Sequence, residues 1–220
     1  MITQAAVYGL GGIGKSELAL QDATRHRGRY RLVWWAEADT PINIQTSLAN
    51  LARAICASPH SIAAGQATVE EAAAWAMAWL SAHPDWLLVL DNVERVADVE
   101  AYLGRLSGGH VLITTRRDIG WQALGCASIN LDVLTLQAAP ALLASLISGA
   151  ARGAATAGTE SEAETARELG ALAEELGCLP LALTQAGGVH RLHPRHERAP
   201  LPAPAAGHPR PGVQGGGTGP

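Results

Sequence analysis

Apolar residues in the first 130 positions of the chain follow two patterns that alternate with each other. Continuous apolar runs, typical of strands buried on both faces of a parallel sheet, occupy residues 5–8, 30–36, 86–90, 110–114 and 127–131. Between these runs, apolar side chains recur at the three- and four-residue spacing of helices that pack one face against a sheet. The alternation predicts an α/β fold with a mostly parallel sheet that helices cover on both faces.

The predicted helices begin and end at recognisable signals. Thr40 and Pro41 form a helix start, with threonine as the cap and proline in the first turn. In the helix after residue 15, we expect Leu18 and Ala19 to face the sheet. The complete set of expected helices covers residues 15–26, 41–55, 69–82, 99–106, 139–147, 160–176 and a segment from 180 onward.

The composition of the chain changes twice after residue 150. Residues 149–159 are rich in glycine and alanine, which indicates a linker between a first domain over 1–150 and part of a small helical domain over 159–189. Beyond about residue 190 the chain has seven prolines and four histidines but almost no bulky apolar side chains, so we expect a disordered tail. Because this change falls within a helical pattern, our hypothesis is that the tail is out-of-frame or otherwise non-native sequence. Its histidines predict no preformed metal site.

Overall composition disfavours several classes of function. A net charge of −4 gives no general reason to expect binding to nucleic acid or to an acidic membrane. Three widely spaced cysteines match neither a metal site nor a disulfide framework and are interpreted as reduced thiols of a cytoplasmic protein. Met1 leads directly into the first strand, so no signal peptide is expected. The uncharged residues 133–151 have one-sided apolar spacing and predict a core-facing helix rather than a membrane span.

The segment that follows the first strand carries the strongest chemical signal. Residues 9–16 read Gly-Leu-Gly-Gly-Ile-Gly-Lys-Ser and match the phosphate-binding pattern G-x-x-x-x-G-K-[ST]. Gly11, Gly12 and Gly14 let the backbone wrap closely and direct N–H groups at an anion, and a helix N-terminus follows. Lys15, the only lysine in the chain, supplies a full charge to the β- and γ-phosphates, and the Ser16 hydroxyl can ligate Mg²⁺. The motif predicts a three-layer P-loop NTPase; the alternative is a glycine-rich turn without a ligand.

Two further candidate residues follow later strands. Asp91 comes directly after the run 86–90, at the sheet edge where open α/β sheets bind ligands, and is interpreted as a second residue that organises Mg²⁺. The alternative is a solvated aspartate in a turn. Arg116 follows the run 110–114, where an arginine can report whether a γ-phosphate is present. Arg117 is expected to face solvent.

Taken in order, these segments resemble the NB-ARC branch of the STAND class of P-loop NTPases. The resemblance is to the type found in actinobacterial proteins that join this module to tetratricopeptide repeats. It covers residues 4–188 and depends on residues 9–16, the Trp34-Trp35 strand, residues 87–92, the Ile113-Thr114-Thr115-Arg116 segment and residues 176–182.

The resemblance implies a switch in signal transduction, in which ADP holds a closed form and exchange for ATP opens it and permits assembly. It implies that Lys15, Asp91 and Arg116 act on the phosphates and that Ser16 and Asp91 organise Mg²⁺. It also implies a set of nucleotide contacts, with Pro180 beside the adenine and sugar; the set comprises Gly11, Gly12, Ile13, Gly14, Lys15, Ser16, Glu17, Leu179 and Pro180.

The chain departs from the family pattern in four respects. Met1 lies too close to the first strand for a preceding adenine-binding segment, and the winged-helix part and any repeats are missing, so we expect a truncated module. Cys178 replaces a common glycine and is expected to strain a tight turn. Asn92 replaces a frequent acidic residue and cannot accept a proton from an attacking water, which predicts slow hydrolysis at best.

The sequence leaves several functions open. The leading hypothesis is a nucleotide switch that self-associates or binds protein partners through missing C-terminal parts. A P-loop kinase or ordinary ATPase and an inactive remnant are the alternatives. Nucleic acid is not expected as a partner, because the arginines of the tail lack interleaved aromatic residues. A membrane is not expected as a partner either.

Overall fold

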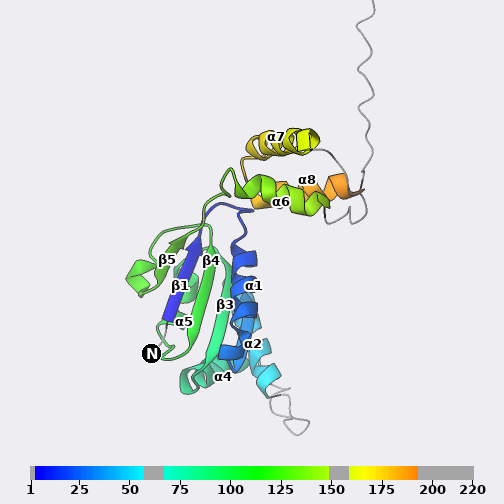
Figure 1. Ribbon diagram of the computed structural model, residues 1–220. Coiled ribbons are helices and arrows are strands. Elements are labelled where there is room, and N and C mark those ends of the chain that lie inside the picture. Colours follow the sequence, from blue (N-terminus) through cyan, green and yellow to red (C-terminus); the bar gives the residue numbers. More distant parts are fainter. Residues whose placement is uncertain (1–2, 57–66, 149–158, 193–220) are drawn as a thin grey trace, which may run out of the picture.

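A five-stranded parallel sheet forms the centre of the first domain (Figure 1). The computed structural model describes residues 3–56, 67–148 and 159–192. Its strand order is β2-β3-β4-β1-β5, and every neighbouring pair is parallel, which confirms the predicted α/β fold. The strands are β1 (Thr3–Tyr8), β2 (Leu32–Glu37), β3 (Trp86–Val93), β4 (His110–Thr115) and β5 (Ala127–Asn130).

Strand β3 shows how helices cover both faces of the sheet. Its side chains alternate: Leu87 and Val89 pack with α1 on one face, whereas Leu88 and Leu90 belong to the larger core on the other face. That larger core also contains buried residues of three helices. The helices of the domain are α1 (Lys15–Arg25), α2 (Pro41–Ile55), α4 (Val69–Ala82) and α5 (Ala97–Leu103), with 3₁₀ turns at Arg27–Arg29 and Gln122–Leu124.

Helix α1 presents a different residue to the sheet from the one we expected. Leu18 is 40% exposed, so the prediction that it faces the sheet is wrong, whereas Ala19 is fully buried as predicted. The buried stripe continues at Ala23, one turn further along, and both alanines pack against β3. Small side chains let α1 lie close to the strands, and this rotation of the helix turns Leu18 towards solvent.

The predicted helix starts are confirmed by their caps. Thr40 accepts a hydrogen bond from the Asn43 N–H at the start of α2, with Pro41 in the first turn. Thr68 and Glu71 form a reciprocal capping box at the start of α4, which satisfies two backbone donors that a helix end leaves free. Helix α4 therefore occupies the predicted residues Val69–Ala82.

Replacing Thr68 with alanine should lower the free energy of unfolding by about 1 kcal/mol, because one side of the capping box is lost. Chemical denaturation followed by circular dichroism measures the change. Thr68→Ser keeps the hydroxyl and should stay within about 0.5 kcal/mol of the wild type. An alanine variant as stable as the serine variant would contradict the role of the cap.

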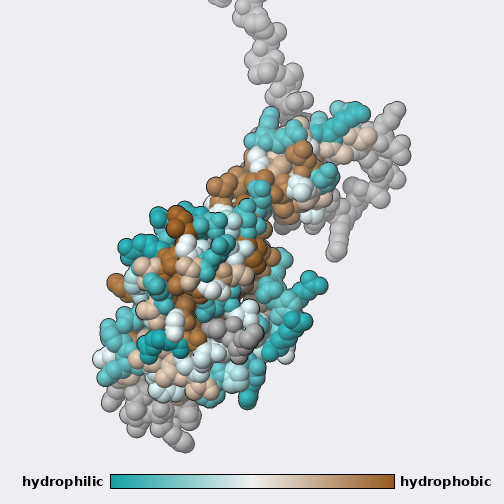
Figure 2. Space-filling model, turned by 90° about the vertical axis from the view of Figure 1, so that its left-hand side faces the viewer, coloured by the Kyte–Doolittle hydropathy of each residue, from teal (hydrophilic) through white to brown (hydrophobic). Residues whose placement is uncertain are grey.

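Three helices form a second unit beyond the carboxyl ends of the strands (Figure 1). They are α6 (Ala138–Ser148), α7 (Thr159–Glu175) and α8 (Pro180–Leu192), and they bury a separate small core that includes Ala139, Leu143, Ala173, Cys178 and Leu183. In the part of the chain that the structure describes, none of these helices packs extensively against a strand or helix of the sheet domain. Figure 2 shows two lobes joined by a narrow neck, where hydrophobic residues gather. Among the described residues, the helical unit and the sheet therefore have separate hydrophobic cores.

The structure tests only some of the predictions made for residues 133–220. Helix α6 lies within the uncharged residues 133–151 and buries Ala139 and Leu143, which confirms the predicted core-facing helix. No described helix is long and apolar enough to cross a bilayer. Helix α7 ends before Gly177, which has a φ of +64°, as expected for a helix C-terminus. The predicted linker over 149–159 lies outside the described residues except for Thr159. Residues 193–220 of the expected tail also lie outside them.

Candidate functional site

The glycine-rich loop connects β1 to α1 at the carboxyl edge of the sheet. Gly14 caps α1 with a φ of +97°, and Gly12 has a φ of +75°. Both values are in the left-handed region that only glycine adopts without strain. The loop therefore combines a helix N-terminus with a backbone that can curve around a small anion.

Lys15 folds back over this loop. Its Nζ donates to the carbonyl oxygens of Gly9 at 2.9 Å and Leu10 at 2.7 Å. Partial burial lowers the pKa of Lys15, Arg116 lowers it further by charge repulsion, and Asp91 opposes the shift. The ammonium group therefore lacks a full counter-charge, and an anionic ligand would supply one.

The lowered pKa of Lys15 predicts a pH dependence of nucleotide affinity. A bound polyphosphate favours the charged lysine, so above the pKa of the free protein each binding event must take up a proton. Affinity should then fall by up to about tenfold per pH unit, starting below the ordinary lysine value of 10.5. Titrations with a fluorescent ADP analogue from about pH 7 to above the ordinary value of 10.5 measure this. A decline in affinity with an apparent pKa at or above 10.5 would contradict the shift.

Ser16, Asp91 and Thr114 form a hydrogen-bonded group beside the loop. The Ser16 hydroxyl donates to Asp91 Oδ1 at 2.7 Å, and the Thr114 hydroxyl donates to the same oxygen. Thr114 Oγ1 also accepts the backbone N–H of Asn92 at 2.8 Å. Strand β3 therefore extends past Asp91 to Val93, further than the apolar run indicated, with an irregular register after Leu90.

This group fits a magnesium ion better than a transition metal. A carboxylate and a hydroxyl are hard oxygen donors, and Mg²⁺ in P-loop sites takes only one or two protein ligands beside phosphates and water. Among the described residues, no group of three or more His, Cys, Asp or Glu side chains could hold a metal alone. Cys126 and Cys178 are buried free cysteines, as expected of core thiols, whereas Cys56 is only half-buried.

A pocket of about 630 Å³ lies between the loop and the helical unit. Eight of the residues predicted from the sequence line it: Gly11, Gly12, Gly14, Lys15, Ser16, Glu17, Arg116 and Pro180. Ile13 and Leu179 are not among the lining residues, and the Ile13 side chain is buried. Asp91 is connected to the pocket through its hydrogen bonds to Ser16 and Thr114.

The structure adds lining residues that were not among the predicted nucleotide contacts, although the sequence already singles out Asn92 for its effect on hydrolysis. They are Gln21, Asn92, Thr114, Leu142, Leu181 and Thr184. Thr114 could have been found, because it is a polar residue near the end of a buried strand and parallel strands end at the same edge. Leu142 of α6 and Thr184 of α8 gave no signal, since only the docking of the helical unit brings them to the pocket.

The helical unit touches the loop directly. The N–H of Leu181, in the first turn of α8, donates to the carbonyl oxygen of Gly12 at 3.1 Å. Just before α8, Cys178 has a φ of +53°, an unfavourable conformation for any residue except glycine. This agrees with the expected strain at a position where glycine is common.

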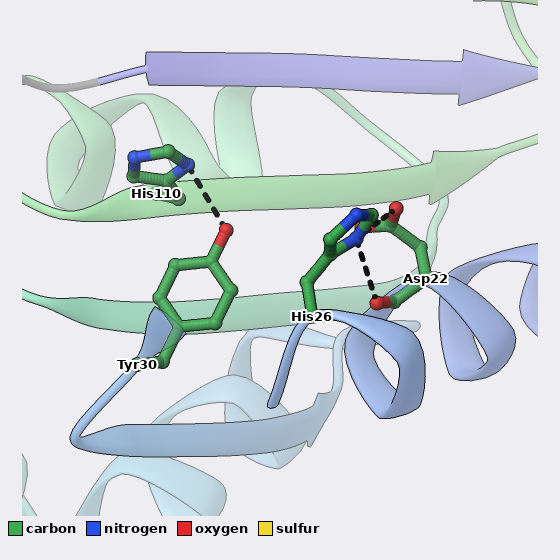
Figure 3. Close-up of polar contacts among 4 residues, drawn as sticks. All are labelled: Asp22, His26, Tyr30 and His110. Carbon is green, nitrogen blue, oxygen red and sulfur yellow. Dashed lines mark hydrogen bonds and ion pairs between the residues drawn. The ribbon is translucent and has the colours of Figure 1, made fainter. Parts of the chain in front are cut away.

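Another group of polar side chains lies at the opposite edge of the sheet and does not reach the pocket (Figure 3). Tyr30 Oη and His110 Nδ1 are hydrogen-bonded at 3.1 Å, and His26 Nδ1 lies 2.9 Å from Asp22 Oδ1. Burial raises the pKa of Tyr30, with a contribution from Asp22. His110 begins β4, whereas Thr114 near the end of the same strand lines the pocket. The Tyr30–His110 bond therefore ties the segment before β2 to the start of β4, whereas the Asp22–His26 contact lies within the end of α1.

Comparisons with known proteins find solved structures that have a similar fold. The chain matches the ORC1 protein of Aeropyrum pernix, solved in complex with DNA, with a TM-score of 0.52 and 19% identity over 86% of this chain and 55% of that one. It matches a point mutant of RuvB from Thermotoga maritima with a TM-score of 0.50 and 11% identity over 84% and 54%. A STAND protein with a tetratricopeptide repeat sensor from Pyrococcus horikoshii has a TM-score of 0.49 and 17% identity over 82% and 26%.

The comparisons by sequence give no match: no protein-family model and no curated protein corresponds to this chain. The chain spans about a quarter to just over half of the solved structures described above. The parallel sheet, the glycine-rich loop and the matches to ORC1 and RuvB together show that the chain has the fold of a P-loop NTPase.

Proposed function

We propose that this chain is a nucleotide-binding switch module of the NB-ARC type, which binds ADP or ATP together with Mg²⁺. The observation that carries the proposal is the pocket of about 630 Å³, whose walls come from the glycine-rich loop on one side and from α6 and α8 on the other. A ligand in this pocket would contact both units at once. Its binding could therefore change how the two units are arranged.

Lys15, Arg116 and the loop amides are the proposed phosphate-binding groups. Lys15 and Arg116 are cations that line one pocket and repel each other, so a polyphosphate would relieve an unfavourable interaction. Because the Ile13 side chain is buried, only the backbone of Ile13 would take part. Arg116 is proposed to read the γ-phosphate, so its loss should weaken ATP binding more than ADP binding.

Ser16 and Asp91 are the proposed residues for Mg²⁺. The Ser16 hydroxyl uses its hydrogen on Asp91 Oδ1 and keeps its lone pairs for a cation. The ion would supply charge compensation for the phosphates. Asp91 would orient the Ser16 hydroxyl and the water molecules around the ion.

The helical unit is the proposed moving part. It has its own core and meets the sheet domain through loops, so a change in its position would break few packed contacts. Pro180 and Leu181 of α8 line the apolar side of the pocket, where a nucleobase and sugar would be sheltered from water. We propose residues 1–150 as the nucleotide-binding domain and 159–189 as part of a small helical domain.

Hydrolysis should be slow or absent. Asn92 lines the pocket at the position after Asp91 and cannot act as a general base. The Glu17 carboxylate, which also lines the pocket, accepts a hydrogen bond from Gln21 at 2.8 Å. The module would therefore hold nucleotide rather than turn it over.

The decisive experiment is to purify the chain, denature it, and identify any released nucleotide by chromatography. We expect ADP or ATP in a substantial fraction of molecules. Thermal unfolding with added Mg²⁺–ADP should show a raised melting temperature, since a ligand that binds only the folded state stabilises it by about 2.7 kcal/mol at a hundred times its Kd. Absence of both effects would refute nucleotide binding.

A further inference from the structure

Thr114 is a buried hydroxyl at the point where the proposed magnesium site meets the sheet. Its side chain comes from β4, next to β3, and the residue is 1% exposed although it lines the pocket. Burying a hydroxyl costs free energy unless its hydrogen-bonding capacity is used. Thr114 uses it on the two residues that follow the apolar run of β3, Asp91 and Asn92.

The two bonds constrain both the side chain and the backbone of that strand end. The Thr114 hydroxyl donates its one hydrogen to Asp91 Oδ1 and accepts from the Asn92 N–H at 2.8 Å. Asn92 has a φ of +61°, which costs free energy for a residue with a side chain. The bond to Thr114 stabilises this conformation, which directs the chain away after Asp91.

The two carboxylate oxygens of Asp91 have different hydrogen-bond partners. Oδ1 receives hydrogen bonds from both Ser16 and Thr114, whereas no hydrogen bond from the described residues reaches Oδ2. A carboxylate held by two hydroxyls on one oxygen has a fixed rotation. The other oxygen then remains available for a water molecule of a hydrated cation.

We propose that Thr114 is a positioning residue for Mg²⁺: it holds Asp91 in the rotation that supports the cation, and through Asp91 it orients Ser16. The inference builds on the proposed nucleotide binding and adds a determinant of the magnesium dependence. Residues that orient metal-supporting groups typically change metal affinity by ten- to a hundredfold when they are replaced.

The test measures nucleotide affinity with and without the cation. A fluorescent ADP analogue is titrated once with Mg²⁺ in millimolar excess and once in EDTA. The Kd in EDTA divided by the Kd in Mg²⁺ is called the magnesium gain. Thr114→Val keeps the shape of the side chain but removes the hydroxyl. We expect the magnesium gain to fall by about tenfold, with the Kd in EDTA changed by less than about threefold. Thr114→Ser should retain the gain.

Thr115 offers a matched control in the same strand. It is equally buried, at 1% exposure, but its hydroxyl oxygen accepts the Arg117 N–H, and among the described residues no hydrogen bond joins it to Asp91. Thr115→Val should therefore lower stability to a similar extent and leave the magnesium gain unchanged. If Thr114→Val does not fold, Thr114→Cys, which keeps a weak donor and a similar volume, gives the same comparison with a smaller loss.

The outcomes separate the two proposals. A Thr114→Val protein with the full magnesium gain, or with equal losses in Mg²⁺ and EDTA, would overturn the positioning role while nucleotide binding stands. A Thr115→Val protein with the same selective loss would also overturn it. A wild-type protein that binds no nucleotide in either condition would refute the proposed function, and the role of Thr114 with it.

Discussion

Replacement of Lys15 with alanine is expected to weaken Mg²⁺–ADP binding by about a hundredfold. Charged hydrogen bonds contribute about 1.5–3 kcal/mol each, and 1.4 kcal/mol corresponds to a factor of ten in affinity. Lys15 is the only lysine of the chain, and its Nζ already lies over the loop, bonded to Gly9 and Leu10. No other ammonium group can replace it. Isothermal titration calorimetry with wild type and variant measures the loss.

The fold should survive this substitution. Lys15 is partly buried with a lowered pKa, so its charge is unfavourable in the free protein, and its removal relieves the repulsion with Arg116. Two hydrogen bonds to loop carbonyls are lost in return. These effects oppose each other, so the melting temperature without nucleotide should stay within about 4 °C of the wild type, the shift that about 1 kcal/mol produces.

Arg117 provides the control for Lys15. It is an exposed cation that follows the same sheet edge but does not line the nucleotide pocket. Arg117→Ala should therefore change affinity by less than about threefold, because an exposed charge is screened by solvent and salt. Equal losses in both variants would mean that general electrostatic attraction, and not the loop, holds the nucleotide.

Local signals explain why the sequence predicted most elements of the fold. The start of α4 is fixed by a side chain that caps its own helix, Thr68, and its end by the proline after His83. The loop over residues 9–16 is likewise recognisable because it needs glycine at specific places and lysine at one. In each case the cause lies within a few residues of its effect.

Features that depend on distant residues were harder to predict. The strand order places β4 between β1 and β3, and this contact brings the Thr114 hydroxyl to Asp91, 23 residues earlier. The extension of β3 to Val93 depends on the same neighbour. Leu142 and Thr184 enter the pocket only because two helices far along the chain dock there. Such contacts follow from tertiary packing, which residue patterns do not encode.

Replacement of Gly12 with alanine is expected to loosen the contact between the helical unit and the loop. An added Cβ would lie 3.0 Å from Leu181 Cβ and 3.1 Å from Leu181 Cδ2, closer than ordinary contact, and the φ of +75° adds about 1–2 kcal/mol of strain. The Leu181 side chain can rotate, but its Cβ is fixed to the backbone of α8. The first turn of α8 must therefore shift by a few tenths of an ångström, which should weaken the bond from Leu181 N to Gly12 O.

Hydrogen exchange at the Leu181 amide, measured without nucleotide, reports this bond directly. Its exchange should be at least about tenfold faster in Gly12→Ala, since about 1.4 kcal/mol of lost protection is a factor of ten. Gly14→Ala is the matched control: its φ is +97°, so the backbone strain is similar, but an added Cβ meets no atom within 4 Å. The control should leave exchange at Leu181 unchanged.

Comparing Gly12→Ala with Gly14→Ala also tests which part of the loop could connect phosphate binding to the helical unit. The peptide that joins Gly12 to Ile13 is planar, so its carbonyl oxygen and its N–H point in opposite directions. The bond from Leu181 to that oxygen therefore fixes the direction of the Ile13 N–H, a proposed phosphate donor. If Gly12→Ala and Gly14→Ala raise Leu181 exchange equally, the helical unit responds to general loosening of the loop and not to this peptide. If only Gly12→Ala does so, the Gly12–Ile13 peptide is the part of the loop that holds α8, and its N–H is the group through which a bound phosphate could act on that contact.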